Sequence, residues 1–337
     1  MQKRYFVGID VSKLTLDVCV VLNAKVLKQQ TLSNQPKTIE GFVKQICRSN
    51  KITPKDILIC MEHTGIYNSH LLEYASRMSI AVCLEHPMQI KNSMGLQRTK
   101  SDKVDAQRIA LYAYKHRETL RLWQPAREVV MRLKDLMGLR RRLLNALNQL
   151  KVPAKEMKGF KNKNSVKHLT AFCQHSIKTL QKELTGINKA IKALIKEDAY
   201  LNKLFSQVTS IDGVGIITAV EVIITTNEFK NINSAKKFAC YAGIAPFEQT
   251  SGTSLRVRNR VSHFANKNVK QLLHMAALSA IVMPGELRNY YLRKTKAGKN
   301  KMSVINAVRN KLVHRIFACV NQDRLYQKKL RKSLVNP

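Results

Sequence analysis

Tyr5-Phe-Val-Gly-Ile-Asp10 is a short run of aromatic and β-branched residues that ends on an acid. A second apolar run that ends on an acid is Ile57-Leu-Ile-Cys-Met-Glu62. Short apolar runs bounded by polar residues are typical of strands buried in a sheet. We therefore predict strands over residues 5–9 and 57–61, each followed by a carboxylate.

The residues around these runs alternate between strand and helix patterns. Apolar runs predict three more strands, at 14–21, 26–32 and 80–84. Amphipathic stretches predict two helices, at 39–46 and 67–75. Three strands followed by alternating helix and strand are typical of a mixed sheet covered by helices. The sequence therefore predicts an α/β domain over residues 1–125.

Four acids draw attention in this domain. If strands 5–9 and 57–61 are adjacent and parallel, Asp10 and Glu62 lie side by side at the carboxyl edge of the sheet, where open α/β sheets place ligands. Asp102 and Asp105 stand three residues apart in Lys100-Ser-Asp-Lys-Val-Asp-Ala106. They share one face if this segment is helical.

Converging carboxylates repel one another unless cations neutralise them. Oxygen ligands suit Mg²⁺ or Mn²⁺, and two such ions can hold the attacking and leaving oxygens of a phosphodiester. The alternative is that each acid has an ordinary local role, as a cap, an ion-pair partner or a surface charge.

The charge of the chain restricts its partners. The 337 residues include 59 Lys and Arg against 22 Asp and Glu, a formal net charge of +37, while 45% hydrophobic residues suffice for folded cores. This surplus indicates a polyanionic partner. No uncharged apolar run of about 18 residues is present, and the seven cysteines form no CxxC pair. We expect no membrane span and a cytoplasmic protein with reduced thiols.

Residues 126–205 have a helical pattern throughout. Their clearest signal is a heptad seam in which apolar residues recur at spacings of three and four, formed by Ile177, Leu180, Leu184, Ile187, Ile191 and Leu194. Such a seam predicts either an antiparallel helical pair within the chain or a coiled coil between chains.

A second compact unit is expected over residues 206–325, followed by a basic tail over 326–337. Gly213-Val-Gly215 precedes an apolar helix at 216–224. It is similar to a helix-hairpin-helix turn, in which backbone N–H groups at a helix N-terminus hold a phosphate. The alternative is a glycine turn that allows close helix packing.

The same unit contains a hydroxyl-rich loop, Thr250-Ser-Gly-Thr-Ser254, followed by Arg256, Arg258 and Arg260. Arginine forks bind phosphate with two hydrogen bonds, and a neighbouring hydroxyl can act as nucleophile toward a phosphodiester. The alternative is a basic strand that binds phosphate without chemistry. A further basic run starts at Arg293 and Lys294 and indicates more phosphate contacts.

These motifs, in this order, resemble the DEDD transposases of insertion-sequence family one-ten over nearly the whole chain. The matching segments are Gly8-Ile-Asp10-Val-Ser-Lys13, Met61-Glu62-His-Thr-Gly65-Ile-Tyr67, Lys100-Ser-Asp102-Lys-Val-Asp105-Ala106, Ile211-Asp-Gly-Val-Gly215, Phe238-Ala-Cys-Tyr-Ala-Gly243-Ile-Ala-Pro246 and Ser251-Gly-Thr-Ser254. Two positions differ from the family pattern: His63 stands where a small residue is expected, and Thr250 where an acid is expected.

The resemblance implies an RNase H-like (RuvC-like) N-terminal domain, a coiled-coil middle segment and a mostly α-helical C-terminal domain. It implies that Asp10, Glu62, Asp102 and Asp105 bind Mg²⁺ or Mn²⁺ and that Ser251 is the nucleophile, with Ser254 the other candidate. It also implies a site-specific recombinase that joins element-end and target DNA through a serine–DNA intermediate. Such enzymes are guided by a structured noncoding RNA and act as dimers or tetramers.

Two other functions fit part of the pattern. A RuvC-like nuclease would use the four acids and hydrolyse DNA with water, without a serine adduct. A non-catalytic RNA-binding protein would use the basic surface alone, and the acids argue against it.

Overall fold

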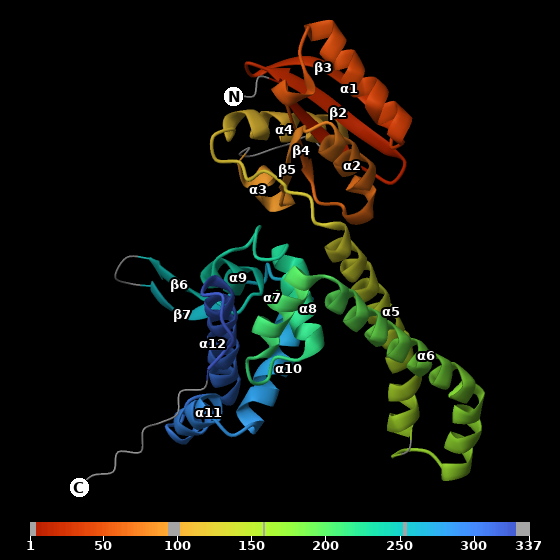
Figure 1. The fold of residues 1–337 in the computed structure, drawn as a ribbon, viewed down its shortest axis with the longest axis vertical. Helices are drawn as coiled ribbons and strands as arrows, with labels where there is room; N and C mark the ends of the chain where they lie inside the picture. The colour runs from red at the N-terminus through yellow and green to blue at the C-terminus, as the bar shows by residue number, and fades with distance from the viewer. Residues whose placement is uncertain (1–4, 94–101, 158, 252–254, 328–337) are drawn as a thin grey trace. The chain divides into compact units, whose positions relative to one another are not determined.

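The computed structural model of the chain describes residues 5–93, 102–157, 159–251 and 255–327, of which 248–251 and 255–260 are described by their backbone only. The chain divides into two compact units, Met1–Pro125 and Ala126–Pro337, here called the N-terminal and the C-terminal unit (Figure 1). Each unit has its own hydrophobic core.

The N-terminal unit is built on a mixed five-stranded sheet in the order β3-β2-β1-β4-β5. Its strands are β1 (Tyr5–Val11), β2 (Thr15–Leu22), β3 (Lys25–Ser33), β4 (Ile57–Glu62) and β5 (Ala81–Glu85). The first three strands are antiparallel, whereas β4 runs parallel to both β1 and β5. The predicted mixed sheet is confirmed, as is the parallel pairing of the strands that end near Asp10 and Glu62.

Helices cover both faces of this sheet (Figure 1). They are α1 (Pro36–Asn50), α2 (Ser69–Arg77), α3 (Pro87–Asn92) and α4 (Asp102–Lys115), and two short 3-10 helices lie at Pro54–Asp56 and Gly65–Asn68. Because side chains alternate between the faces of a strand, Val7 and Ile9 of β1 enter the core with α1 and α2. Phe6 points to the other face and packs with α4.

Helix α4 lies directly against the backbone of β1 at Gly8. A Cβ atom on Gly8 would be 2.2 Å from both the carbonyl oxygen of Ala106 and the backbone nitrogen of Ala110. Ala106 and Ala110 are themselves fully buried. The absence of a side chain at Gly8 therefore lets α4 approach the sheet two residues before Asp10.

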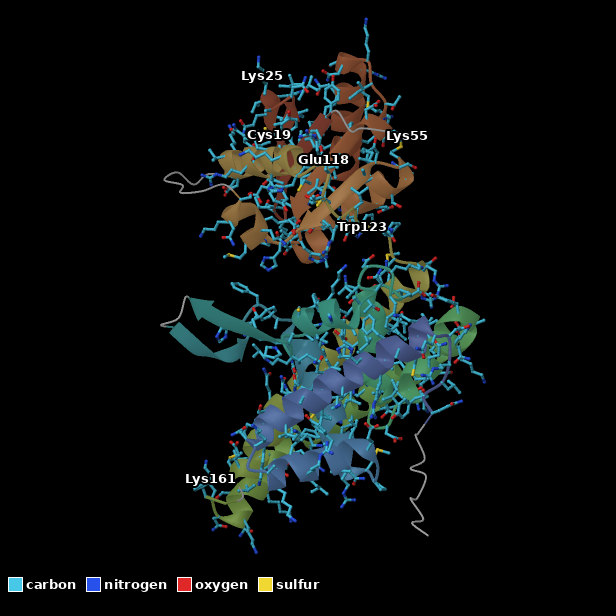
Figure 2. All side chains as sticks on the ribbon, turned by 90° about the vertical axis from the view of Figure 1, so that its left-hand side faces the viewer. Cys19, Lys25, Lys55, Glu118, Trp123 and Lys161 are labelled. Atoms are coloured by element: carbon cyan, nitrogen blue, oxygen red, sulfur yellow. The ribbon has the colours of Figure 1, made fainter. Side chains whose placement is uncertain are left out.

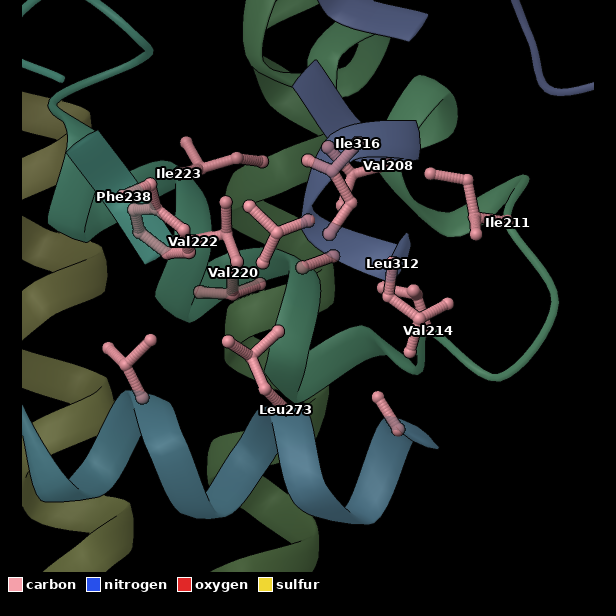
Figure 3. Packing of buried hydrophobic residues seen from close by; sticks show 14 of the residues in the cluster. Val208, Ile211, Val214, Val220, Val222, Ile223, Phe238, Leu273, Leu312 and Ile316 are labelled. Carbon is pink, nitrogen blue, oxygen red and sulfur yellow. The ribbon is translucent and has the colours of Figure 1, made fainter. Parts of the chain in front are cut away.

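The C-terminal unit is mostly helical, as predicted. Its helices are α5 (Glu128–Met157), α6 (Lys163–Glu197), α7 (Ala199–Thr209), α8 (Ile216–Thr226), α9 (Ala235–Tyr241), α10 (Lys267–Val282), α11 (Glu286–Lys296) and α12 (Lys301–Asn321). A two-stranded hairpin of β6 (Pro246–Ser251) and β7 (Leu255–Val261) lies between α9 and α10. Figure 3 shows the core of the unit, where Val208, Val220, Leu273 and Leu312 meet from four helices.

Helices α5 and α6 form a long antiparallel pair (Figure 1). The predicted pairing within the chain is therefore present. The seam is buried where it joins the C-terminal core, at Ile191 and Leu194, and only half-buried at Ile177. The far end of the pair, here called the hairpin tip, exposes four large apolar side chains: Val152, Phe160, Leu169 and Phe172.

An ionic network around the buried Glu228 carboxylate fixes the start of α5. The Arg127 guanidinium donates to the Asp198 carboxylate at 2.6 Å and forms a second ion pair with Glu228. The Glu228 side chain is fully buried and also accepts from Lys230 at 3.0 Å. This network joins the residue just before α5 to the N-cap of α7 and to the loop after α8.

The surface carries most of the basic side chains. Exposed lysines occur on both units, among them Lys25, Lys55 and Lys161 (Figure 2). Among the described helices, none is both long and apolar enough to cross a membrane.

Gly8→Ala is expected to destabilise the N-terminal unit by about 3 kcal/mol or more, because the new methyl group meets backbone atoms that cannot move separately. Trp123 is the only tryptophan of the chain and packs on the core of this unit, so urea denaturation followed by its fluorescence measures the effect. The control is Gly41→Ala, on the exposed face of α1 with open space around it. This change should stabilise the helix by about 0.5–1 kcal/mol. Equal effects of the two substitutions would contradict the close packing of α4.

Arg127→Met is expected to destabilise the C-terminal unit by about 2 kcal/mol at pH 7, because it leaves the buried Glu228 carboxylate with Lys230 as its remaining partner. Hydrogen bonds from Arg127 lower the pKa of Asp198 below its ordinary 3.8. Burial acts to raise the pKa of Glu228, but hydrogen bonds from Arg127 and Lys230 outweigh it and bring the pKa below 4.5.

Carboxyls with a lowered pKa stabilise the folded state above their unfolded pKa, and this contribution disappears as the pH falls through the folded pKa. The difference in unfolding free energy between wild type and Arg127→Met should therefore be constant above about pH 5 and shrink as the pH falls below 4. Urea denaturation followed by circular dichroism at pH 7, 5 and 3.5 measures this trend. A difference that does not depend on pH would contradict it.

Candidate active site

The register of the central strands places two of the predicted acids next to each other. Ile9 pairs with Met61 across the parallel β1–β4 ladder, so the following residues, Asp10 and Glu62, are neighbours at the carboxyl edge. Both are half-buried. This is the edge at which open α/β sheets bind ligands.

The row of acids extends beyond these two. Asp17 on β2 lies opposite Asp10, and Glu85 on β5 lies opposite Glu62. Both have hydrogen-bond donors: Thr31 Oγ1 donates to Asp17 at 2.5 Å, and the Tyr112 hydroxyl donates to Glu85 at 3.0 Å. Sequence reasoning missed these acids, although Glu85 ends β5 just as Glu62 ends β4.

Helix α4 brings the other two predicted acids toward the same edge. Burial raises the pKa of Asp10, and repulsion from Asp102, Asp105 and Asp17 raises it further. Burial likewise raises the pKa of Glu62, followed by repulsion from Asp10 and Asp105. All four predicted acids therefore interact through their charges.

The donor set suits a hard divalent cation. Carboxylate oxygens are the preferred ligands of Mg²⁺ and Mn²⁺, and a cation between these acids would relieve the repulsion that raises the pKa of Asp10 and Glu62. In the described part of the chain, no three His, Cys, Asp or Glu side chains are grouped as a metal site. Asp105 is instead paired with Arg108 at 2.6 Å.

A buried amide fixes the end of β4. Asn68 is 2% exposed, and its Oδ1 accepts from the backbone N–H and the hydroxyl of Thr64 at 2.8 and 2.6 Å. Its Nδ2 donates to the Glu62 carbonyl at 2.9 Å and contacts the Met61 sulfur at 3.0 Å. These bonds hold the backbone of Glu62 and the turn that follows it.

A second buried amide joins two loops at this edge. Asn34 is 4% exposed, and its Nδ2 donates to the carbonyls of Ser12 and Tyr67, each at 3.0 Å. Ser12 follows β1 and Tyr67 follows β4. Asn34 and Asn68 therefore hold the segments just beyond Asp10 and Glu62. The sequence analysis missed this role, because asparagine is also common in ordinary turns.

The predicted serine site lies in the C-terminal unit. Ser251 ends β6 and pairs with Leu255, the first residue of the basic strand β7. Arg256, Arg258 and Arg260 occupy alternate positions of β7. Their side chains, that of Ser251 and the whole of Ser254 lie outside the described parts of the chain.

The other predicted phosphate contacts fall into two groups. Gly213 has a left-handed φ of +87°, and a Cβ there would be 2.6 Å from the Ala276 carbonyl of α10, so this glycine allows close helix packing. Gly215 is exposed, directly precedes α8, and has open space where a side chain would be. Arg293 and Lys294 lie on α11, where Arg293 is exposed and stacks on Tyr290 at 6.0 Å.

Two family models match the chain. One, DEDD_Tnp_IS110, is described as a transposase and matches residues 7–157, and the other is described as the transposase IS116/IS110/IS902 family and matches residues 206–292. Together they span most of the chain. One covers the predicted acids, and the other covers the β6–β7 hairpin with Ser251, here called the serine hairpin.

Several curated relatives are similar. The pilin gene-inverting proteins of Moraxella lacunata and Moraxella bovis are each 26% identical over 338 residues, covering 98% of this chain and 99% of each relative. An insertion element IS110 protein of Streptomyces coelicolor is 24% identical over 46% of this chain and 38% of its own. Among solved structures, Thermus thermophilus RuvC in complex with a Holliday junction substrate is 16% identical and covers 36% of this chain and 99% of its own, with a TM-score of 0.28.

Asn68→Ala is expected to weaken Mn²⁺ binding by about 10–100-fold, because it frees the backbone that positions Glu62. Isothermal titration with Mn²⁺ measures this affinity. Asn92→Ala removes an exposed amide at the end of α3 and should leave the affinity unchanged. Tight Mn²⁺ binding by folded Asn68→Ala would show that Glu62 does not need this support.

Proposed function

Because the chain belongs to the IS110 family of DEDD transposases, we propose that it is an RNA-guided DNA recombinase that cuts and rejoins DNA through a covalent serine–DNA intermediate. The observation that supports the proposal is the adjacency of Asp10 and Glu62 at one sheet edge, where the charges of Asp102 and Asp105 on α4 add to their mutual repulsion. Such an arrangement is unfavourable without a cation, and the basic surface provides for a polyanionic substrate.

The four acids would hold Mg²⁺, or Mn²⁺ in its place. When bound, such an ion polarises a scissile phosphate and stabilises the negative charge that develops on it. The protein supplies the oxygen ligands and their orientation. Asp10 and Glu62 come from the sheet, Asp102 and Asp105 come from α4, and Asn68 fixes the turn after Glu62.

Ser251 is proposed as the nucleophile of the C-terminal unit. Its Oγ would attack the phosphorus of a DNA phosphodiester, forming a phosphoserine bond while the bond to the leaving deoxyribose oxygen breaks. The serine proton passes to solvent or a neighbouring base, and the leaving oxygen takes up a proton. Attack by the hydroxyl of another DNA end reverses these steps and joins the strands, so the bond energy is retained.

Phosphates near the scissile bond would be held by basic residues of the same unit. The positions of Arg256, Arg258 and Arg260 on β7 place them in the strand next to Ser251. The N-terminus of α8 after Gly215, together with Arg293 and Lys294, offers weaker contacts.

The net charge of +37 supports an RNA partner in addition to the DNA of the element ends and the target. In the proposed complex, a structured noncoding guide RNA selects both DNAs by base pairing, so the protein itself needs mainly phosphate contacts. Exposed apolar residues at the hairpin tip, Phe160 and Phe172 above all, support subunit contacts in a dimer or tetramer. This complex would act in the cytoplasm.

We expect the wild-type protein, with co-expressed flanking RNA, element-junction DNA and Mg²⁺, to form a protein–DNA adduct that survives denaturing electrophoresis. Ser251→Ala and Asp102→Asn should each reduce adduct formation on the order of 10³-fold or more, since one removes the nucleophile and the other a metal ligand. Asp135→Asn, an exposed acid on α5, is the matched control and should retain the adduct.

Two results would change the proposal. If the DNA is cleaved without an adduct, and the cleavage persists in Ser251→Ala, the protein is a nuclease that uses water. Loss of the adduct in Ser254→Ala alone would move the nucleophile to Ser254.

A further inference from the structure

Arg309 on α12 is a buried cation that has no anionic partner among the described residues. It is 6% exposed, and no described carboxylate lies within ion-pair distance of it. Its Nη2 contacts His274 Nδ1 of α10 at 2.7 Å, and its Nη1 reaches Asn306 Oδ1 at 3.4 Å. Its Nε is buried and has no hydrogen-bond acceptor among the described residues.

The contact with His274 does not neutralise this charge. A guanidinium has only donors, so His274 must accept at Nδ1 and carry its proton at Nε2. Burial and the Arg309 charge lower the pKa of His274, in agreement with a neutral ring. Arg309 therefore keeps its full charge in a desolvated position, which is unfavourable. Arg127, by contrast, has two carboxylates.

The buried charge lies next to the base of the β6–β7 hairpin. Asn306, one turn before Arg309 on α12, donates from Nδ2 to the Ile244 carbonyl at 2.8 Å, two residues before β6 begins. The other end of the hairpin is attached nearby, because the backbone N–H of Asn266 donates to the Tyr241 carbonyl at 2.9 Å. His274 and Asn306 are both half-buried, so the guanidinium is close beneath the surface.

We propose that Arg309 is a phosphate-binding residue, whose charge is neutralised when a backbone phosphate of the DNA strand engaged by the serine hairpin binds beside it. The identification of that strand rests on the function proposed above. Arginine suits the role because its planar fork can donate two hydrogen bonds to one phosphate. Its unpaired Nε supplies one of these donors at once. A structural arginine at this depth would have a carboxylate partner.

The first test measures the melting temperature of the full-length protein in the presence and absence of inorganic phosphate. Without phosphate, Arg309→Met should melt a few degrees above the wild type, since an apolar side chain of similar length replaces an unpaired charge. Phosphate should raise the melting temperature of the wild type more than that of Arg309→Met. Arg288→Met, an exposed arginine of α11, should respond to phosphate like the wild type.

The second test measures adduct formation on element-junction DNA and, separately, affinity for the guide RNA. Arg309→Met should reduce adduct formation about 100-fold and leave RNA affinity unchanged. Arg309→Lys keeps the charge but loses the fork, and should fall between the two. An equal loss of RNA affinity would assign the phosphate to RNA and overturn the assignment to DNA.

If Arg309→Met melts at a lower temperature than the wild type without phosphate, the charge of Arg309 is structural and the proposal is overturned. The proposal is also overturned if this variant forms as much adduct as the wild type. If the wild type forms no adduct, the serine mechanism fails. The phosphate comparison then still decides the role of Arg309, because it requires no catalysis: an equal phosphate response in wild type and variant refutes the site.

Discussion

The contact between α4 and the backbone of β1 at Gly8 determines the geometry of the acidic site. A strand advances about 3.3 Å per residue, so Asp10 lies about 7 Å beyond this contact. Asp102 and Asp105 lie within about one helical turn of Ala106, on the same helix. The distance between the two pairs of acids is therefore fixed by residues without functional groups: Gly8, Ala106 and Ala110. A larger side chain at any of them would move α4 away from the sheet and separate the acids.

Both units keep unfavourable charge, of opposite sign. In the N-terminal unit, burial and then repulsion among carboxylates raise the pKa of Asp10 and Glu62, and the buried amides of Asn34 and Asn68 hold the adjacent loops in place. In the C-terminal unit, Arg309 is buried and has no carboxylate partner in the part of the chain that the structure describes. Divalent cations would complement the carboxylates, and the phosphate of a phosphodiester would complement Arg309. In the proposed function, substrate binding thus offsets energy that folding alone leaves uncompensated.

Much of this fold could be predicted from the sequence, because the signals were local. The apolar runs that end at Asp10 and Glu62 indicated both the strands and the acids, and confirmed parallel pairing brings the acids together. Glu85 was missed because its place in the row depends on the register of β5. Asn34 and Asn68 were missed because a buried asparagine and a turn asparagine look alike in sequence. Arg309 was missed for a similar reason: among 59 basic residues, burial alone distinguishes it.

The α5–α6 pair shows how assembly and charge are connected in the proposed complex. The apolar side chains of its seam are buried within the chain at Ile191 and Leu194, whereas Phe160 and Phe172 at the hairpin tip remain exposed. Burying a Phe side chain contributes about 1.5–3 kcal/mol, but two chains of +37 each repel one another. Salt screens charges over about 8 Å at physiological ionic strength, whereas bound RNA or DNA neutralises them directly. In the proposed complex, apolar contacts between subunits would therefore become favourable chiefly once nucleic acid is bound, which would link oligomer formation to the presence of the guide RNA and its DNA.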